Sequence, residues 1–166
     1  MKCSKKYVWI GFFFCLVLGS LSHFFYQWSS NTPAVGLFSP VNESAWEHMK
    51  LVFFPVLLYT ISARLFLKNA PDTLLSASLL GLLAGTLFIP VFFYAYSGIL
   101  GFDVFWLDIL DFILALLLTS YITCRCSSHE KIRKLLPLLL FLTLLFAAAF
   151  FYFTFHPPQL GIFAEP

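Results

Sequence analysis

Charged residues are scarce in this sequence. Only 11% of its 166 residues are Asp, Glu, Lys or Arg, whereas about a quarter are charged in soluble domains. Hydrophobic residues make up 60% of the chain, which excludes the soluble globular classes and predicts an integral membrane protein. The net charge is only +2, and the basic residues form short clusters between apolar segments. Nothing in this pattern favours nucleic-acid binding.

The chain also lacks several motifs and division points. It contains no HExxH or HxxxH pattern, no internal repeat, and no linker long enough to separate two domains. We therefore expect a single membrane domain over residues 1–166. Of the four cysteines, Cys3, Cys124 and Cys126 are predicted at the cytoplasmic face and Cys15 lies inside an apolar segment. No disulfide is expected, because cytoplasmic thiols stay reduced.

Five apolar segments are long enough to cross a bilayer as helices, at residues 7–28, 47–67, 74–96, 104–123 and 135–155. The first begins like a signal peptide, but bulky residues stand where a cleavage site would need small ones, so it is interpreted as a retained helix. Ser39 followed by Pro40 predicts a helix that begins near Ser39 and runs into the second span. The fold class is therefore all-α, an integral membrane bundle of about five transmembrane helices.

Lysine and arginine positions predict the orientation. With five spans and a cytoplasmic N-terminus, only Lys50 lies outside. The inner segments hold the other nine of the ten basic residues, namely Lys2, Lys5, Lys6, Arg64, Lys68, Arg125, Lys131, Arg133 and Lys134. The positive-inside rule then predicts a cytoplasmic N-terminus and an external C-terminus.

This topology gathers most other ionisable residues toward the outer side: His23, Glu43, Glu47, His48, Asp103, Asp108, Asp111 and His156. Asp108 and Asp111 share a helical face, and they lie roughly 7 Å and 12 Å from Asp103 along a core about 30 Å thick. An aspartate at that depth costs about 2.5–3.5 kcal/mol, so it must face the bundle interior, pair, or stay protonated. We interpret the pair as functional. The alternative is that the two side chains only fix the helices to one another through hydrogen bonds.

The densest polar run is Ser39–Lys50. Helical spacing predicts Glu43, Trp46, Glu47 and Lys50 on one stripe; the alternative is a solvated first turn with acidic residues at the positive end of the helix dipole. We expect an outward-facing pocket here, with Trp46 fixing the start of the helix at the membrane interface. The pocket candidates are Asn42, Glu43, Trp46, Glu47, His48, Asp108 and Asp111.

Three chemistries could use such a pocket. A divalent metal could be bound by ligands from Glu43, Glu47, His48, His23, Asp108, Asp111 and His156, since imidazole and carboxylate groups suit zinc or manganese. A buried aspartate could instead change protonation as an ion or solute passes. Lastly, Glu47 or His48 could act as the general base of a membrane-embedded hydrolase or transferase. Catalytic residues are not assigned. A lone histidine in a membrane helix is more often a helix-packing hydrogen-bond partner than a ligand, and His23 taken alone has that interpretation.

The leading predicted function is the handling of small solutes or ions, among them metal ions. The alternatives are a membrane-embedded metal-dependent hydrolase or transferase, and a non-catalytic subunit of a membrane complex. The lipid bilayer is the expected environment. Because 166 residues enclose little space on their own, we also expect a homo-oligomer or a membrane-protein partner.

Asn42-Glu43-Ser44, followed by Trp46-Glu47-His48 and the Phe53-Phe54-Pro55 run, resembles the signature of a family of small bacterial polytopic membrane proteins of unknown function. The His156-Pro157-Pro158 ending is similar to that family's C-terminal end. The resemblance covers nearly the whole chain. It implies a bacterial cytoplasmic-membrane location and a helical bundle of about five spans, and it implies no activity.

Overall fold

The computed structural model describes residues 5–66 and 71–165. Its long helices are α1 (Lys5–Trp28), α3 (Ala45–Phe66), α4 (Asp72–Leu100), α5 (Phe105–Cys126) and α6 (Leu136–Phe153). Three short helical elements join or follow them: α2 (Pro33–Gly36), η1 (Glu130–Leu135) and η2 (Gly161–Phe163). The described residues contain no strand. Five helical stretches, the last running from Glu130 to Phe153, are long and apolar enough to cross a membrane, which confirms the predicted all-α bundle.

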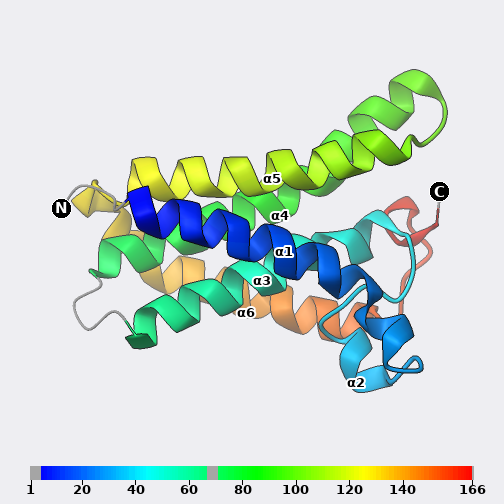
Figure 1. Ribbon diagram of the computed structural model, residues 1–166, viewed down its shortest axis with the longest axis horizontal. Coiled ribbons are helices and arrows are strands. Elements are labelled where there is room, and N and C mark those ends of the chain that lie inside the picture. Colours follow the sequence, from blue (N-terminus) through cyan, green and yellow to red (C-terminus); the bar gives the residue numbers. More distant parts are fainter. Residues whose placement is uncertain (1–4, 67–70, 166) are drawn as a thin grey trace.

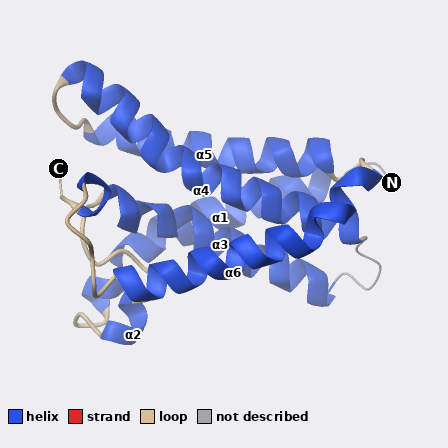
Figure 2. Cartoon of the chain, turned by 180° about the vertical axis from the view of Figure 1, so that it is seen from behind, coloured by secondary structure: helices blue, strands red, loops and turns tan. Residues whose placement is uncertain are grey.

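The long helices lie side by side, and their connections gather at two ends of the bundle (Figure 1). We call these the α2 end, which also carries the C-terminal segment, and the η1 end, where α1 begins. The most buried apolar stretches are those of α3 and α4, at 44% and 56%, against 17–22% for the other three. Seen from behind, α6 lies on the face opposite α1 (Figure 2). The core is therefore built around α3 and α4.

Aromatic rings and small residues both contribute to helix packing. Aromatic rings join α3 to α6, where Phe53 and Phe150 are fully buried with ring centroids 5.1 Å apart. Small residues join α4 to α5, because a Cβ atom added at Gly81 would lie 2.6 Å from the Thr119 carbonyl oxygen. Glycine therefore permits a close backbone approach that a larger residue would prevent.

The start of α3 differs from the prediction. The helix begins at Ala45, not near Ser39. The Glu47 amide donates to Ser44 Oγ at 3.4 Å and the His48 amide to the Ser44 carbonyl at 3.1 Å, so Ser44 caps the helix. Ser39 instead donates its hydroxyl to the Val35 carbonyl at 2.8 Å. Glu43 therefore lies outside the helix, and the prediction that it shares a stripe with Glu47 and Lys50 is wrong.

Candidate metal centre

Three ligand-type side chains meet at the α2 end: His23 from α1, Glu43 from the loop before α3, and His48 from the first turn of α3. One donor atom from each lies within 4.8 Å of the other two. The Glu43 carboxylate stands between the imidazoles, with Oε1 3.7 Å from His23 Nε2 and Oε2 3.4 Å from His48 Nε2. Two imidazoles and one carboxylate form a ligand set that zinc uses in proteins. We call these three residues the triad.

Local hydrogen bonds orient the triad. His48 Nδ1–H donates to the Ser44 carbonyl at 3.1 Å, which fixes the ring with its Nε2 atom directed to Glu43. A metal-binding histidine commonly has its second nitrogen held in this way. The Asn42 Oδ1 atom accepts from the Ser44 amide at 3.1 Å, an Asx turn that fixes the loop carrying Glu43. His23 stacks on His48 with ring centroids 5.5 Å apart.

The triad is half-open to its surroundings. The side chains of His23 and His48 are 29% and 26% exposed, and that of Glu43 is 58% exposed. The pKa of Glu43 lies below its ordinary value, first because of its hydrogen bond with His48 and then because of its attraction to both imidazoles, against an opposing effect of partial burial. The carboxylate is therefore anionic at neutral pH and accessible at the protein surface.

Two aspartates of α5 are further candidates, and one of them interacts with the triad. Asp108 accepts a hydrogen bond from the Tyr96 hydroxyl of α4 and is close enough to His48 and Glu43 to interact with both electrostatically. Asp111 lies about 4.5 Å further along the helix, is 3% exposed, and its Oδ1 atom has no hydrogen-bond partner among the described residues. Neither aspartate belongs to the group of mutually close ligand atoms.

Glu47 belongs to a different cluster. Lys50 Nζ donates to Glu47 Oε2 at 2.7 Å, to the Gly36 carbonyl at 2.8 Å and to Thr154 Oγ1 at 2.6 Å. The same Glu47 oxygen accepts from the Val41 amide at 3.0 Å. The side chains of Lys50 and Glu47 are 0% and 3% exposed. This buried pair therefore ties the loop after α2 and the end of α6 to α3, and we call it the lock.

Comparison with protein-family models matches residues 1–166 to the Family of unknown function (DUF6512). The chain belongs to DUF6512. No curated protein matches this DUF6512 chain, and no solved structure does. The family match agrees with the expected resemblance to a family of unknown function over nearly the whole chain.

The remaining candidates of this DUF6512 chain lie apart from the triad. Trp46 packs against Phe150 and Phe163, at centroid distances of 4.8 Å and 4.9 Å, and is 9% exposed. His156 is exposed and stacks on Tyr152 at 5.0 Å, with its Nδ1 atom 3.3 Å from the Tyr152 carbonyl. The structure therefore brings together His23, Glu43 and His48 from the candidate ligands, with Asp108 nearby.

Tyr96 is the residue of this region that the sequence did not predict. The Tyr96 hydroxyl donates a hydrogen bond to Asp108, and Tyr96 is 9% exposed. The signal available in the sequence was weak: Tyr96 stands near the end of an apolar span, as Asp108 stands near the start of the next. Because interfacial tyrosines are common in membrane helices, that position alone indicates no role.

Proposed function

We propose that this protein binds a divalent transition-metal ion of the zinc type through His23, Glu43 and His48, and that its function is ion handling at one membrane face. The observation that carries the proposal is the Glu43 carboxylate placed 3.4 Å and 3.7 Å from two imidazole Nε2 atoms. Ligands bound to tetrahedral zinc at about 2.0–2.1 Å lie roughly 3.3 Å from one another. The side chains therefore need only small adjustments to surround an ion.

The open geometry of the triad supports handling over a purely structural role. Structural zinc sites have four protein ligands, whereas three protein ligands leave a position open for water or another ligand. Glu43 is 58% exposed, which gives an ion a way in and out. An exchangeable ion fits a protein that captures or transfers metal better than one that only needs metal to fold.

The charge distribution supports an external position for the triad. Lys6, Arg64, Arg125, Lys131, Arg133 and Lys134 belong to the η1 end. Because basic residues concentrate in cytoplasmic segments, the η1 end is cytoplasmic in this proposal and the α2 end faces outward. The proposed location is a bacterial cytoplasmic membrane.

Metal-dependent hydrolysis is the second candidate function, and the position of Asp108 favours it. A metal held by three protein ligands can polarise a carbonyl or phosphoryl group. Asp108, held by Tyr96 and electrostatically coupled to His48 and Glu43, would accept the proton of an attacking water. The substrate would then lie at the membrane face of the α2 end.

Zinc titration of the purified protein in detergent tests the proposal. Cys3, Cys124 and Cys126 are first replaced by serine, so that thiols outside the apolar spans do not contribute, and bound metal is removed by chelation. We expect calorimetry to give one zinc ion per chain, with the affinity reduced at least tenfold in His48→Ala and unchanged in His156→Ala, a matched control on an exposed histidine. Equal affinities in the two variants, or no binding by the parent, would overturn the proposal.

A further inference from the structure

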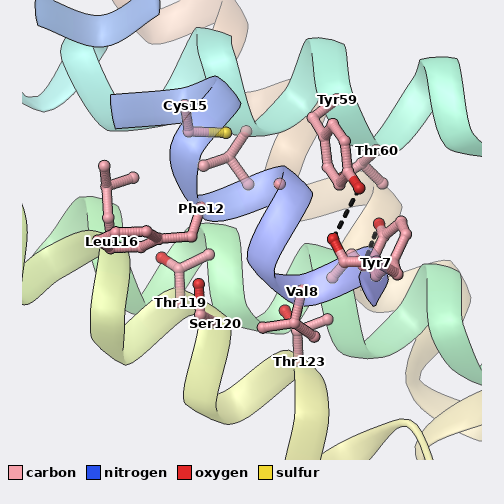
Figure 3. A pocket seen from close by; sticks show the side chains of 13 residues that line it. Tyr7, Val8, Phe12, Cys15, Tyr59, Thr60, Leu116, Thr119, Ser120 and Thr123 are labelled. Atoms are coloured by element: carbon pink, nitrogen blue, oxygen red, sulfur yellow. Dashed lines mark hydrogen bonds between the residues drawn. The ribbon is translucent and has the colours of Figure 1, made fainter. Parts of the chain in front are cut away.

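A small cavity lies in the half of the bundle away from the triad. It is bordered by residues of α1, α3, α4 and α5, and its volume is about 30 Å³. Figure 3 shows hydroxyl-bearing side chains from different helices around it. Besides Tyr7, the hydroxyl-bearing lining consists of Tyr59, Thr60, Ser78, Thr119, Ser120 and Thr123. No charged side chain lines it, so its chemistry differs from that of the triad.

Several hydroxyls of this cavity are paired with the protein, and the Tyr7 and Ser78 hydroxyls share a hydrogen bond at 3.1 Å. Tyr59 donates its hydroxyl to the Tyr7 carbonyl at 2.7 Å, and Thr119 donates to the Gly81 carbonyl at 3.0 Å. The Thr60 hydroxyl is different: the residue is 3% exposed, and its Oγ1 atom has no hydrogen-bond partner among the described residues. A buried hydroxyl without a partner costs on the order of 1–3 kcal/mol, so this atom is a strong reason for a polar occupant.

The size and the neutral lining define that occupant. A space of about 30 Å³ has room for roughly two water molecules. A divalent cation would need carboxylate, imidazole or thiolate ligands to replace its hydration shell, and the lining offers neutral hydroxyls and the Cys15 thiol. Hydroxyls both donate and accept hydrogen bonds, which matches water and other neutral molecules of its size.

The cavity begins near the η1 end of the bundle. Its lining includes Tyr7, two residues after the first residue of α1, and Thr123, three residues before the last residue of α5. Further into the bundle it is lined by Cys15 and Leu116, and both of these residues are buried. The lining therefore extends from the η1 end of the helices toward their middle.

We propose that the cavity is a hydrated vestibule that admits water from the η1 end as far as the Cys15 thiol, with Thr60 as its buried hydrogen-bonding anchor. Thr119 and Asp111 are eight residues apart on α5, about 12 Å along the helix. The apolar layer between vestibule and Asp111, which includes the buried residues Ala115 and Leu116, is then much thinner than the roughly 30 Å hydrocarbon core.

Two polar compartments therefore approach each other from opposite ends of the bundle. If the triad handles an ion, as in the proposed function, the vestibule is the second access of the same transmembrane path. The vestibule itself does not depend on metal binding.

Silver-ion accessibility of Cys15 tests the vestibule. The variant carries Cys15 alone, with Cys3, Cys124 and Cys126 replaced by serine, in reconstituted vesicles. Aqueous Ag⁺ is small and charged, and it reacts by forming a bond to sulfur as the thiol proton passes to water. Thiols left free are then counted with a maleimide after denaturation. We expect Ag⁺ to block Cys15, and Ser120→Leu, which fills the cavity, to slow the reaction at least tenfold.

The matched control is Tyr121→Leu, on the neighbouring residue, which is 64% exposed on the outside of the bundle. It should leave the silver reaction unchanged. Thr60→Val, which keeps the shape of the side chain and removes the unpaired hydroxyl, should slow the reaction several-fold and serves if Ser120→Leu does not fold. A Cys15 thiol that stays free in the folded protein, or that reacts equally fast in the filled variants, would overturn the vestibule.

The two proposals fail separately. His48→Ala should lose zinc binding and keep the silver reaction of Cys15 at its original rate. A parent protein that binds no zinc but reacts with Ag⁺ would remove the metal site and leave the vestibule. A parent that binds zinc but shields Cys15 from Ag⁺ would do the reverse.

Discussion

The lock and the triad stand within a few residues of each other and have opposite properties. In the lock, Lys50 and Glu47 are 0% and 3% exposed, and the ammonium makes three hydrogen bonds. In the triad, Glu43 is 58% exposed and the two imidazoles face it with Nε2 atoms. A buried charged pair with complete hydrogen bonding is retained for structure, whereas a half-exposed ligand set is available to bind. Residue type alone does not separate the two.

The largest effect should follow from breaking the lock. Lys50→Met keeps much of the side-chain volume but leaves the Glu47 carboxylate buried without its cation, which costs about 3–5 kcal/mol. We expect severe loss of folded protein in detergent, measured by thermal unfolding and size-exclusion chromatography. Lys134→Met, at an exposed lysine, is the control and should behave like the parent. A stable Lys50→Met protein would mean that the lock is not structural.

A double variant sharpens this result. Replacing Glu47 by glutamine together with Lys50→Met removes both charges, and neutral replacements of a buried pair are often tolerated much better than loss of one partner. We expect the double variant to recover part of the lost thermal stability while zinc affinity stays at the parental value in the protein that folds. If zinc affinity fell in the folded double variant, the two clusters would not be independent.

Changing the triad should do the opposite. Glu43→Gln removes the anionic ligand from a half-exposed position, so the free energy of unfolding of the metal-free protein should change by less than about 1 kcal/mol. Zinc affinity should fall at least tenfold in calorimetric titration. An equal loss of stability in Glu43→Gln and Lys50→Met would mean that the triad stabilises the fold as much as the lock does.

Asn42→Ala tests the loop that carries Glu43. Its Oδ1 atom accepts from the Ser44 amide, and loss of such a local bond costs about 0.5–2 kcal/mol. We expect zinc affinity to be several-fold weaker, while the lock formed by Lys50 and Glu47 stays intact. Unchanged affinity would show that the Asx turn does not position Glu43.

The smallest effect concerns pH. The pKa of Glu43 is lowered in the folded protein, so its pairing with the imidazoles stabilises the fold above the ordinary carboxyl range near 4.3 and is lost as the pH falls through the lowered value. In metal-free protein, the stability difference between the parent and Glu43→Gln should therefore shrink as the pH falls from about 5 to below about 4. A difference that grew on acidification would contradict the sign of this shift.

The sequence predicted the fold well because helix length and hydropathy are local properties that the bilayer constrains strongly. The five stretches that are long and apolar enough to cross a membrane follow from that pattern. The sequence did not predict that Glu43 and Glu47 belong to different clusters. Ser39 with Pro40 and Ser44 are both good helix starts, and the choice between them depends on tertiary contacts.

Those contacts join residues distant in sequence. Lys50 bonds to Gly36 and Thr154, 14 and 104 residues away, and no local pattern indicates either bond. The same holds for the Tyr96 hydroxyl on Asp108 and for the unpaired Thr60 hydroxyl in its cavity. Both depend on how α4 and α3 pack against their neighbours, which periodicity does not specify.

X-ray absorption at the zinc edge of the zinc-loaded protein tests the central claim most directly, with all four native cysteines retained. The triad predicts a first shell of nitrogen and oxygen atoms at about 2.0–2.1 Å, with the outer-shell scattering of two imidazoles. This pattern should disappear in His48→Ala and persist in His156→Ala. A shell of sulfur atoms at about 2.3 Å, or no retained zinc, would contradict a metal centre built from His23, Glu43 and His48.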